Sequence, residues 1–318
     1  MVKRIGVLTS GGDAPGMNAA IRAVTRTALV NGLEVYGIHD GYRGMYDGDI
    51  ERLYRRSVSE KINRGGTFLG TARLKEFANE EVREEAVDQL RKFGIDALVC
   101  IGGDGTYRGA LALSKMGIKT VGVPGTIDND IVGTDYTIGF DTASNTVIEL
   151  VDKLRDTSSS HRRCSVVEVM GRNCGSIALN AAISVGAEAV ICKEVPFDKE
   201  ALINTINSAS KSKRHAIIIV AEHTIDCEAL AKEITERTSF EGRATVIGHI
   251  QRGGSPTCRD RVLASRMGVK AVEALMREES GVCVCSKNDV LTTMPIEDAL
   301  KETRDRVSGL IDVFNDLL

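Results

Sequence analysis

Short apolar runs rich in β-branched residues alternate with helix-like segments along almost the whole chain, and this alternation constrains the fold more than any other feature. The predicted strands are Arg4–Thr9, Leu33–Ile38, Ala97–Ile101, Thr120–Val123, Ser165–Val169, Ala189–Cys192, Ala216–Val220 and Thr245–Ile247. The predicted helices are Met17–Val30, Glu80–Phe93, Tyr107–Met116, Ser144–Arg155, Lys199–Ser210, Ala229–Arg237 and Asp260–Arg277. Strands that alternate with helices favour parallel sheets covered by helices, so the sequence predicts an α/β fold.

The length and charge of the chain limit its organisation and its partners. At 318 residues it exceeds the usual size of a single core, so about two domains are expected. The net charge of -3 gives no overall attraction to nucleic acid or to an anionic membrane. The apolar stretches, such as 216–221, are too short to span a bilayer, and the chain starts with a strand pattern rather than a signal sequence. We therefore expect a cytoplasmic protein that binds neither nucleic acid nor membrane.

Eight cysteines are scattered along the chain, mostly within apolar runs. Neither a CxxC pair nor a His/Cys set with zinc spacing occurs, so buried reduced thiols are the preferred interpretation. Cys283 and Cys285 alternate with valines, which predicts a strand whose two faces differ. A redox pair at these two positions is the alternative.

Two loops that follow predicted strands combine glycine with residues suited to phosphate or metal. The loop at 9–18 (TSGGDAPGMN) can hold a phosphate at the start of a helix, and it is not a Walker A loop because it contains no Lys followed by Ser or Thr. The loop at 102–106 (GGDGT) adds Asp104, which could bind Mg²⁺ together with phosphate oxygens; the alternative is that Asp104 caps a helix. Ligands bind at the carboxyl ends of strands in α/β sheets, so two such loops suggest one shared ligand.

A third loop, PGTIDND at 124–130, contains two carboxylates separated by one residue. In extended backbone Asp128 and Asp130 would point to the same side, and one of them could act as a general base. A sugar hydroxyl is a poor nucleophile, and a carboxylate within hydrogen-bond distance can accept its proton as phosphoryl transfer proceeds. The alternative is an Asx-rich turn without a catalytic role.

Basic side chains recur near other strand ends. The stretches MGR at 170–172 and HIQRGGS at 249–255 each place glycine beside a cation, which favours a phosphate ester held by charge-assisted hydrogen bonds over solvated surface charges. The cations near strand ends are Arg73, Arg163, Arg172, Arg243, His249 and Arg252.

The motifs GGDAPGMN, GGDGT, PGTIDND, MGR and GHIQRGGSP occur in this order, and through them the chain resembles the bacterial ATP-dependent 6-phosphofructokinases over essentially its whole length. The resemblance implies transfer of the γ-phosphoryl group of ATP to the 1-hydroxyl of fructose 6-phosphate, the committed step of glycolysis, with Mg²⁺ as cofactor. It also implies two three-layer α/β/α Rossmann-like domains with mostly parallel sheets and an active site in the cleft between them. The larger, ATP-binding domain would comprise 1–138 and 250–301, and the smaller, sugar-phosphate-binding domain 139–249 and 302–318.

The resemblance also implies roles for the matching residues. Asp128 would be the catalytic base, Thr126 and Asp130 would orient the reacting groups, and Arg172 with Arg73 would stabilise charge on the transferred phosphoryl group. The ATP side would be formed by Gly12, Arg73, Leu74, Gly103, Asp104, Gly105 and Thr106, with Asp104 at Mg²⁺. The substrate side would be formed by Thr126, Ile127, Asp128, Arg163, Met170, Gly171, Arg172, Glu222, Arg243, His249, Ile250, Gln251 and Arg252.

Regulation and assembly also follow from the resemblance. The family forms homotetramers in which the residues matching Arg163 and Arg243 reach into a neighbour's active site, which implies cooperative binding of fructose 6-phosphate. An effector site would bind ADP or GDP as activator and phosphoenolpyruvate as inhibitor. Its residues would be Arg22, Arg26, Arg55, Arg155, Gly186, Glu188, Lys211, Lys213, Arg214 and His215, with Glu188 available for an effector-bound Mg²⁺. A solvated helix face is the alternative for Arg22 and Arg26, which lie four residues apart.

Three other functions remain as alternatives. Pyrophosphate-dependent relatives resemble this pattern but generally carry Lys where this chain has Gly125 and often Asp where it has Gly105, so glycine at both positions favours ATP. An NAD or lipid kinase would share only the GGDGT loop and has no role for GHIQRGGSP. A non-catalytic nucleotide sensor with the same fold would be expected to have lost Asp104 or Asp128, and both are present.

Overall fold

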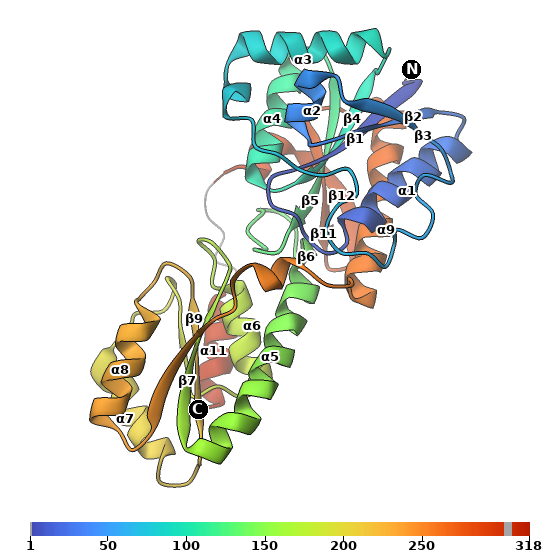
Figure 1. Ribbon diagram of the computed structural model, residues 1–318. Coiled ribbons are helices and arrows are strands. Elements are labelled where there is room, and N and C mark those ends of the chain that lie inside the picture. Colours follow the sequence, from blue (N-terminus) through green and yellow to red (C-terminus); the bar gives the residue numbers. More distant parts are fainter. Residues whose placement is uncertain (1, 302–306) are drawn as a thin grey trace. The chain divides into compact units, whose positions relative to one another are not determined.

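The computed structural model describes residues 2–301 and 307–318, which divide into two compact units (Figure 1). Unit 1 comprises the described residues of Met1–Thr142 and Arg252–Thr303, and unit 2 those of Ala143–Gln251 and Arg304–Leu318. Each unit contains a sheet with helices packed on it. The predicted α/β class is therefore confirmed.

The sheet of unit 1 positions the glycine-rich loops. Its strand order is β12-β11-β5-β4-β1-β2-β3, in which β2, β1, β4, β5 and β11 are parallel and β3 and β12 are antiparallel edge strands. The strands are β1 (Arg4–Ser10), β2 (Glu34–Ile38), β3 (Ile50–Leu53), β4 (Ala97–Gly102), β5 (Lys119–Thr126), β11 (Val282–Lys287) and β12 (Val290–Pro295), and the two-residue β6 (Ile138–Gly139) pairs with the end of β5. All six residues of β4 are buried, as expected for a central parallel strand covered on both faces.

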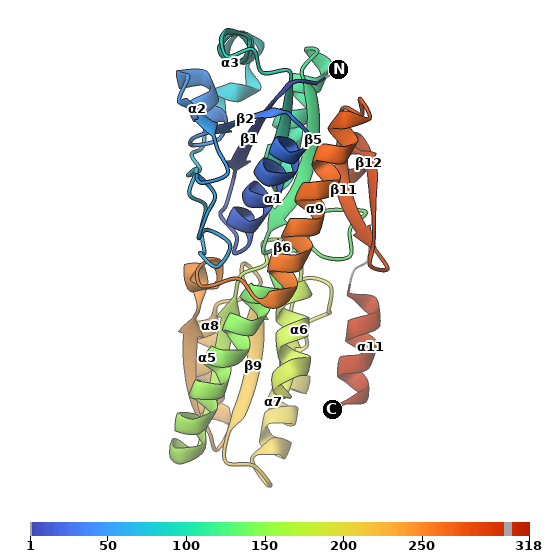
Figure 2. The same cartoon turned by 90° about the vertical axis from the view of Figure 1, so that its right-hand side faces the viewer.

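Helices cover both faces of this sheet (Figures 1 and 2). The helices α1 (Met17–Val30) and α9 (Cys258–Met276) pack against each other on one face. The other face carries α4 (Asp104–Lys115), and α2 (Tyr42–Asp47) packs against α3 (Glu80–Lys92) there, with the 3-10 turn η1 (Lys75–Ala78) and α10 (Ile296–Ala299) beside them. Buried Leu98 and Cys100 of β4 share a core on this face with Tyr107 and Leu113 of α4.

Unit 2 is built on a four-stranded sheet in which every pairing is parallel, with the order β10-β7-β9-β8. Its strands are β7 (Arg163–Val169), β8 (Ala189–Ile191), β9 (Ala216–Ala221) and β10 (Glu241–Val246). Its helices are α6 (Ser176–Val185), α7 (Lys199–Ala209), α8 (Cys227–Arg237), α11 (Ser308–Asp316) and most of α5 (Phe140–His161), whose first three residues belong to unit 1. The 3-10 turn η2 (Gly248–Arg252) follows β10, and its last residue belongs to unit 1. Figure 1 shows α7 and α8 on one side of the sheet and α5, α6 and α11 on the other.

Sequence patterns located most of these elements but missed several. The helix α6 was not predicted because its sequence SIALNAAISV is almost wholly buried and has no polar face that would mark a helical period. The strand β10 begins at Glu241, four residues before the predicted start at Thr245, because a half-exposed edge strand with charged side chains gives no apolar run. The helix α4 begins at Asp104 and not at Tyr107.

The cysteine predictions need two corrections. All eight cysteines lie in the described part of the chain as thiols, and six are buried, but Cys174 is half-buried and Cys258 is exposed at the start of α9. The stretch with Cys283 and Cys285 is a strand, as predicted, yet its two faces do not differ in burial, because Val284 between them is buried as well. The reason is that helices cover both faces of this strand: α9 and α10 both contact β11, and Cys283 and Cys285 share a core with Ile296 and Ala299 of α10. No helix in residues 2–301 or 307–318 has the length and apolar character needed to cross a membrane.

Candidate active site

The loops after β1 and β4 lie against each other at the carboxyl edge of the unit 1 sheet. The strand register pairs Ser10 with Gly102, and the hydroxyl of Thr106 donates a hydrogen bond of 2.8 Å to the carbonyl oxygen of Ser10. The carbonyl oxygen of Thr106 in turn accepts a 2.5 Å hydrogen bond from the hydroxyl of Tyr42. A Cβ atom on Gly102 would overlap both the Ser10 carbonyl oxygen and the Thr106 hydroxyl, so this close approach of the two loops requires glycine.

The GGDGT loop leads directly into α4. Gly103 is the residue that precedes the helix and Asp104 is the first residue of its first turn, so the alternative that Asp104 serves as the N-cap is wrong. The N–H groups in the first turn of a helix lack intrahelical acceptors and point out of its end, where they favour an anion. Gly105 is exposed, and no heavy atom lies within 4 Å of the position that a Cβ atom would take there. The start of α4 therefore offers backbone donors beside open space.

The PGTIDND loop lies beside the GGDGT loop but is not extended. The register pairs Gly102 with Pro124, and a Cβ atom on Gly103 would lie 3.7 Å from Cβ of Thr126. The strand β5 ends at Thr126, and Asn129 has a φ of 52°. The expected extended backbone between Asp128 and Asp130 is therefore wrong, because the chain turns between them.

Both carboxylates of this loop are partly withdrawn from solvent. The Oδ1 atoms of Asp128 and Asp130 are buried, and the side chains are half-buried overall. The backbone N–H of Asp128 donates to the hydroxyl of Thr126 at 3.2 Å, which closes the start of the turn. A carboxylate in such a place is shielded from bulk water while keeping one side open to a substrate.

Two further segments complete the edge of unit 1. The loop before Arg73 is tied to the first glycine-rich loop, because the hydroxyl of Thr71 donates to the carbonyl oxygen of Gly11 at 2.8 Å. Arg73 itself is exposed, whereas Leu74 packs against the core around α2 to α4. The guanidinium of Arg252 lies beside Gly12, since a Cβ atom on Gly12 would lie 3.2 Å from Cζ of Arg252. Arg252, expected at the sugar phosphate, thus neighbours a residue expected at ATP.

In unit 2 the loop after β7 is shaped by two polar side chains. The carboxylate Oε1 of Glu222 accepts hydrogen bonds from the backbone N–H of Gly171 at 3.1 Å and of Arg172 at 2.7 Å. The side-chain oxygen of buried Gln251 accepts from the backbone N–H of Met170 at 2.8 Å. The φ values of 144° at Gly171 and 57° at Arg172 belong to this turn, which leaves the Arg172 side chain exposed. His249 and Ile250 are exposed on the same unit.

Arg163 and Arg243 lie at the other end of this sheet. Arg163 is the first residue of β7, and its Nε atom lies 2.8 Å from a carboxylate oxygen of Glu241, which also pairs with Arg243. The hydrogen bond from Arg163 lowers the pKa of Glu241, with the charge of Arg243 acting in the same direction. Met170 is seven residues beyond Arg163 and five beyond Ser165, which pairs with Arg243. These separations correspond to about 23 and about 17 Å at about 3.3 Å per residue. Within one chain these two arginines therefore do not join Arg172.

The basic residues expected at an effector site form two clusters, one on each unit. On unit 1, partial burial lowers the pKa of Arg22, and the charges of Arg26 and Arg55 lower it further. Three guanidinium groups are thus gathered from α1 and from the segment after β3. Arg22 and Arg26 are half-buried, which disfavours the alternative of a solvated helix face.

On unit 2, Glu188 and His215 organise the second cluster. Glu188 is buried, its carboxylate accepts from the backbone N–H of Ile217 at 2.6 Å, and it forms a 2.7 Å ion pair with Lys213. Nε2 of His215 lies 3.1 Å from a guanidinium nitrogen of Arg155. Burial lowers the pKa of His215, and the charges of Arg155 and Lys213 add to this effect while Glu188 opposes it. Lys211 and Arg214 are exposed beside them.

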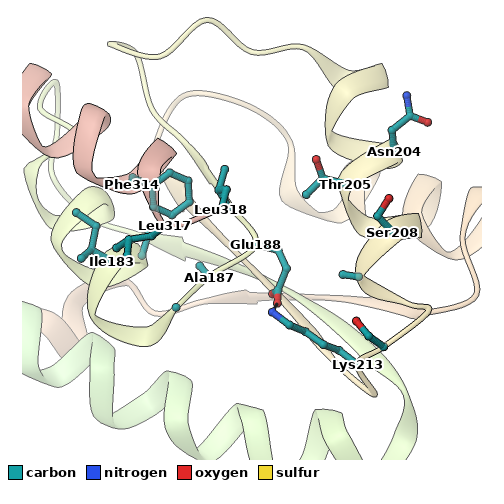
Figure 3. A pocket seen from close by; sticks show the side chains of 14 residues that line it. Ile183, Ala187, Glu188, Asn204, Thr205, Ser208, Lys213, Phe314, Leu317 and Leu318 are labelled. Carbon is teal, nitrogen blue, oxygen red and sulfur yellow. Dashed lines mark hydrogen bonds and ion pairs between the residues drawn. The ribbon is translucent and has the colours of Figure 1, made fainter.

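A cavity of about 560 Å³ opens next to this second cluster (Figure 3). Gly186, Glu188 and Lys213 line it, and Figure 3 shows the side chains of Glu188 and Lys213 meeting each other. The remaining walls come from residues that sequence reasoning did not select, namely Ala182, Ile183, Ala187, Asn204, Thr205, Ser208, Ala209, Ser212, Phe314, Leu317 and Leu318. Phe314 lies in the last helix, α11, and Leu317 and Leu318 follow it.

Sequence reasoning also missed a buried carboxylate near the start of α9. Asp260 accepts hydrogen bonds from the backbone N–H of Gly139 at 2.9 Å, and from the N–H and hydroxyl of Thr142 at 2.8 and 2.5 Å. Its own N–H donates to the hydroxyl of Thr257, the N-cap of α9. The spacing of Thr257 and Asp260 matches a helix N-terminal capping pattern, and that was the signal available in the sequence. Asp260 therefore ties the start of α9 to the segment that follows β6.

Comparison with known proteins agrees with these features. The family model described as phosphofructokinase matches residues 4–275. The ATP-dependent 6-phosphofructokinase of Edwardsiella ictaluri (strain 93-146) is 57% identical over 310 residues, covering 97% of this chain and 97% of the relative. That of Vibrio vulnificus (strain YJ016) is 60% identical over 305 residues, covering 96% and 95%. Among solved structures, phosphofructokinase from Saccharomyces cerevisiae is similar with a TM-score of 0.89 and 35% identity, covering 99% of this chain and 48% of that chain.

Proposed function

The chain belongs to the phosphofructokinase family and is an ATP-dependent 6-phosphofructokinase, and we propose how its residues carry out the reaction. The enzyme transfers the γ-phosphoryl group of ATP to fructose 6-phosphate at its 1-hydroxyl, giving fructose 1,6-bisphosphate and ADP in the committed step of glycolysis. The loops after β1, β4 and β5 converge at one edge of the unit 1 sheet, and this observation supports the catalytic and ATP-binding roles that we assign to their residues. An NAD or lipid kinase is excluded by the family.

We assign the binding of ATP to unit 1. The first turn of α4, with Gly103, Gly105 and Thr106, provides backbone donors for phosphate oxygens, and the glycine-rich loop at Gly12 lies beside it. Open space at Gly105 supports a nucleotide in this position rather than the smaller pyrophosphate. Arg73, which is exposed on a loop tied to Gly11, provides a cation for the transferred group, and Leu74 supports that loop by packing on the core.

The residues present fit a magnesium ion that is held partly by the protein and partly by the phosphate oxygens of ATP. In the described part of the chain, no three His, Cys, Asp or Glu side chains are grouped in a way that could hold a metal. Mg²⁺ commonly takes one or two carboxylates and completes its shell with phosphate oxygens and water. Asp104, at the start of α4, would hold it in this way. When bound with ATP, the ion would neutralise charge on the phosphates.

We assign the base to Asp128 and the sugar contacts mainly to unit 2. The Asp128 carboxylate accepts the proton of the 1-hydroxyl as the phosphoryl group is transferred, and Thr126 and Asp130 orient the reacting groups. Arg172 stabilises negative charge on the phosphoryl group as it is transferred. Backbone at Ile127 and the loop Met170–Arg172, held by Glu222 and Gln251, position the sugar, with His249, Ile250 and Arg252 toward its phosphate.

We also propose that the active enzyme is a homotetramer with shared sites. The observation that supports it is the position of Arg163 and Arg243 at the end of the unit 2 sheet opposite to the loop that carries Arg172. We assign these two arginines to the phosphate of the substrate bound at the site of another subunit. Mixing an Arg163→Ala variant with an Asp128→Ala variant should then restore activity, since some hybrid sites contain both native residues. Hybrids that regain no activity, although mass measurements show that subunits exchange, would contradict sharing.

For regulation we propose ADP or GDP as activator and phosphoenolpyruvate as inhibitor. The clusters around Arg22 and around Glu188 have the charge to bind phosphate groups, and Glu188 is available to an effector-bound Mg²⁺. The additional arginines Arg56 and Arg162 add positive charge nearby in sequence. The thiol state of all eight cysteines suits the reducing cytoplasm, where we place the enzyme.

The donor and product are tested directly by identifying the products. Incubation with fructose 6-phosphate and Mg²⁺, with either ATP or pyrophosphate as donor, is followed by phosphorus NMR. The proposal predicts fructose 1,6-bisphosphate with ATP and none with pyrophosphate. Product formed with pyrophosphate alone would instead establish the pyrophosphate-dependent alternative.

A further inference from the structure

Asn129 separates the two carboxylates of the PGTIDND loop. It occupies the left-handed region with a φ of 52°, and its side chain is buried, with 7% of the residue exposed. Asparagine is one of the few residues other than glycine that adopts this conformation at low cost. The identity of this residue therefore affects both the shape of the turn and the buried hydrogen bonds between the turn and the segment 134–137.

The side chain of Asn129 bonds to the segment 134–137 through both of its polar atoms. Its Oδ1 atom accepts a 3.0 Å hydrogen bond from the backbone N–H of Thr137, and its Nδ2 atom donates to the carbonyl oxygen of Asp135 at 3.3 Å. The hydroxyl of Thr137 donates a 2.6 Å hydrogen bond to the carbonyl oxygen of Thr126. The loop that carries Asp128 is thus cross-linked to a second segment at both of its ends.

That second segment is itself anchored to the sheet. The backbone N–H of Asp135 donates to the carbonyl oxygen of Ser286 at 2.7 Å, and the N–H of Ser286 donates to the hydroxyl of Thr134 at 2.9 Å. Ser286 belongs to β11, and the chain after Thr137 continues into β6, which pairs with the last residues of β5. Through Asn129 the turn at Asp128 is therefore connected to two strands of the unit 1 sheet.

From this geometry we infer that Asn129 is a positioning residue for the base Asp128, an inference that rests on the proposed function. The side chain of Asn129 fixes the turn that presents the Asp128 carboxylate, and it acts through Asp128 without contacting the substrate. Proton transfer depends steeply on the geometry of the hydrogen bond between base and hydroxyl. Loss of this support should therefore lower kcat far more than it weakens binding of either substrate.

Two substitutions at Asn129 separate the side-chain bonds from the backbone conformation. Asn129→Gly keeps the left-handed conformation readily available but removes both hydrogen bonds, and it should lower kcat by about 30-fold, with half-saturation for ATP and fructose 6-phosphate within about threefold of native. Asn129→Ala adds backbone strain and should be at least as impaired. The matched control is Asn288→Gly, because Asn288 also has a left-handed φ, 50°, but is exposed in the turn between β11 and β12. This control should retain native kcat.

A double-mutant cycle with Asp128→Asn decides whether Asn129 acts through the base. If it does, adding Asn129→Gly to Asp128→Asn lowers kcat by less than about twofold further, because there is no longer a base to position. Equal losses of kcat in the native and Asp128→Asn backgrounds would overturn the inference and leave Asn129 a purely structural residue. Asp128→Asn with native kcat would overturn the assignment of the base itself, which distinguishes failure of the proposed function from failure of this inference. Thermal unfolding of each variant gives the folded fraction used to normalise kcat.

Discussion

Substitution of Gly105 by Asp should act in opposite directions on folding and on the use of ATP. Gly105 is the second residue of α4, is exposed, and has no heavy atom within 4 Å of an added Cβ position. Nothing in the fold therefore requires glycine here. Replacing glycine in a helix gains up to about 1 kcal/mol, and an acidic group in the first turn adds about 0.3 to 1 kcal/mol. The variant should be more stable than the native protein by about 1 kcal/mol.

The same carboxylate should oppose the phosphates of ATP. If it lies about 5 Å from a phosphate oxygen in a medium with an effective dielectric constant of about 20, the repulsion is about 3 kcal/mol. That energy corresponds to a loss in kcat/KM for ATP of roughly a hundredfold. The carboxylate also occupies space that the nucleoside would need, so the charge estimate is a lower bound on the effect.

Urea unfolding and a coupled assay of ADP release measure the two effects on the same samples. Gly105→Ala and Gly105→Asn are the matched controls: the first adds only a Cβ atom, and the second has nearly the shape of aspartate without its charge. We expect kcat/KM for ATP to decrease in the order native, Gly105→Ala, Gly105→Asn, Gly105→Asp. A Gly105→Asp variant that is destabilised, or that keeps kcat/KM for ATP within about threefold of native, would refute the reasoning, since three-fold is under 1 kcal/mol.

Three further predictions concern the fold, the effector cluster and the cavity. Gly102→Ala should destabilise the protein by about 2 kcal/mol or more, because the new methyl group would overlap the Ser10 carbonyl oxygen; an unchanged urea midpoint would contradict this. The pKa of His215, measured by NMR titration, should lie below the ordinary 6.5. As the pH falls, His215 is protonated in the unfolded chain before it is protonated in the folded protein. The stability associated with neutral His215 is therefore present above pH 6.5 and is lost as the pH falls through the lower pKa of the folded state. A pKa at or above 6.5 would contradict the effect of burial and of Arg155. Ser208→Phe, which fills the cavity beside Glu188, should weaken activation by ADP at least about tenfold while leaving kcat without effector unchanged, and native activation would exclude the cavity from effector binding.

Strands, turns and loops could be predicted from the sequence where apolar runs and glycines determine the local structure. The run Ala97–Ile101 is apolar throughout because β4 is covered on both faces, and the glycines after it mark a turn that lies against Ser10. The loops at strand ends could be expected to converge, because parallel strands end at one edge of a sheet. The helix α6 could not be found in this way, because burial on nearly all sides removes the amphipathic period.

Specific side-chain hydrogen bonds decided two of the features that the sequence patterns missed or predicted wrongly. The turn at Asn129 depends on hydrogen bonds to Asp135 and Thr137, and no pattern of two aspartates reveals them. Asp260 is buried against a segment 118 residues earlier in the chain, so only its position in a capping pattern was visible. The sequence separation of these contacts ranges from six residues for Asn129 and Asp135 to 118 residues for Asp260 and Thr142.

The assignment of Asp128 as the base is tested most directly by ADP release with fructose 6-phosphate and Mg²⁺, measured with ATP and with pyrophosphate for the native enzyme and for Asp128→Ala. The account predicts turnover with ATP alone, and a kcat lower by about a thousandfold or more in the variant, with half-saturation for ATP nearly unchanged. A folded Asp128→Ala enzyme that keeps a tenth or more of native kcat would contradict the assignment of the base, and turnover with pyrophosphate instead of ATP would contradict the assignment of the donor.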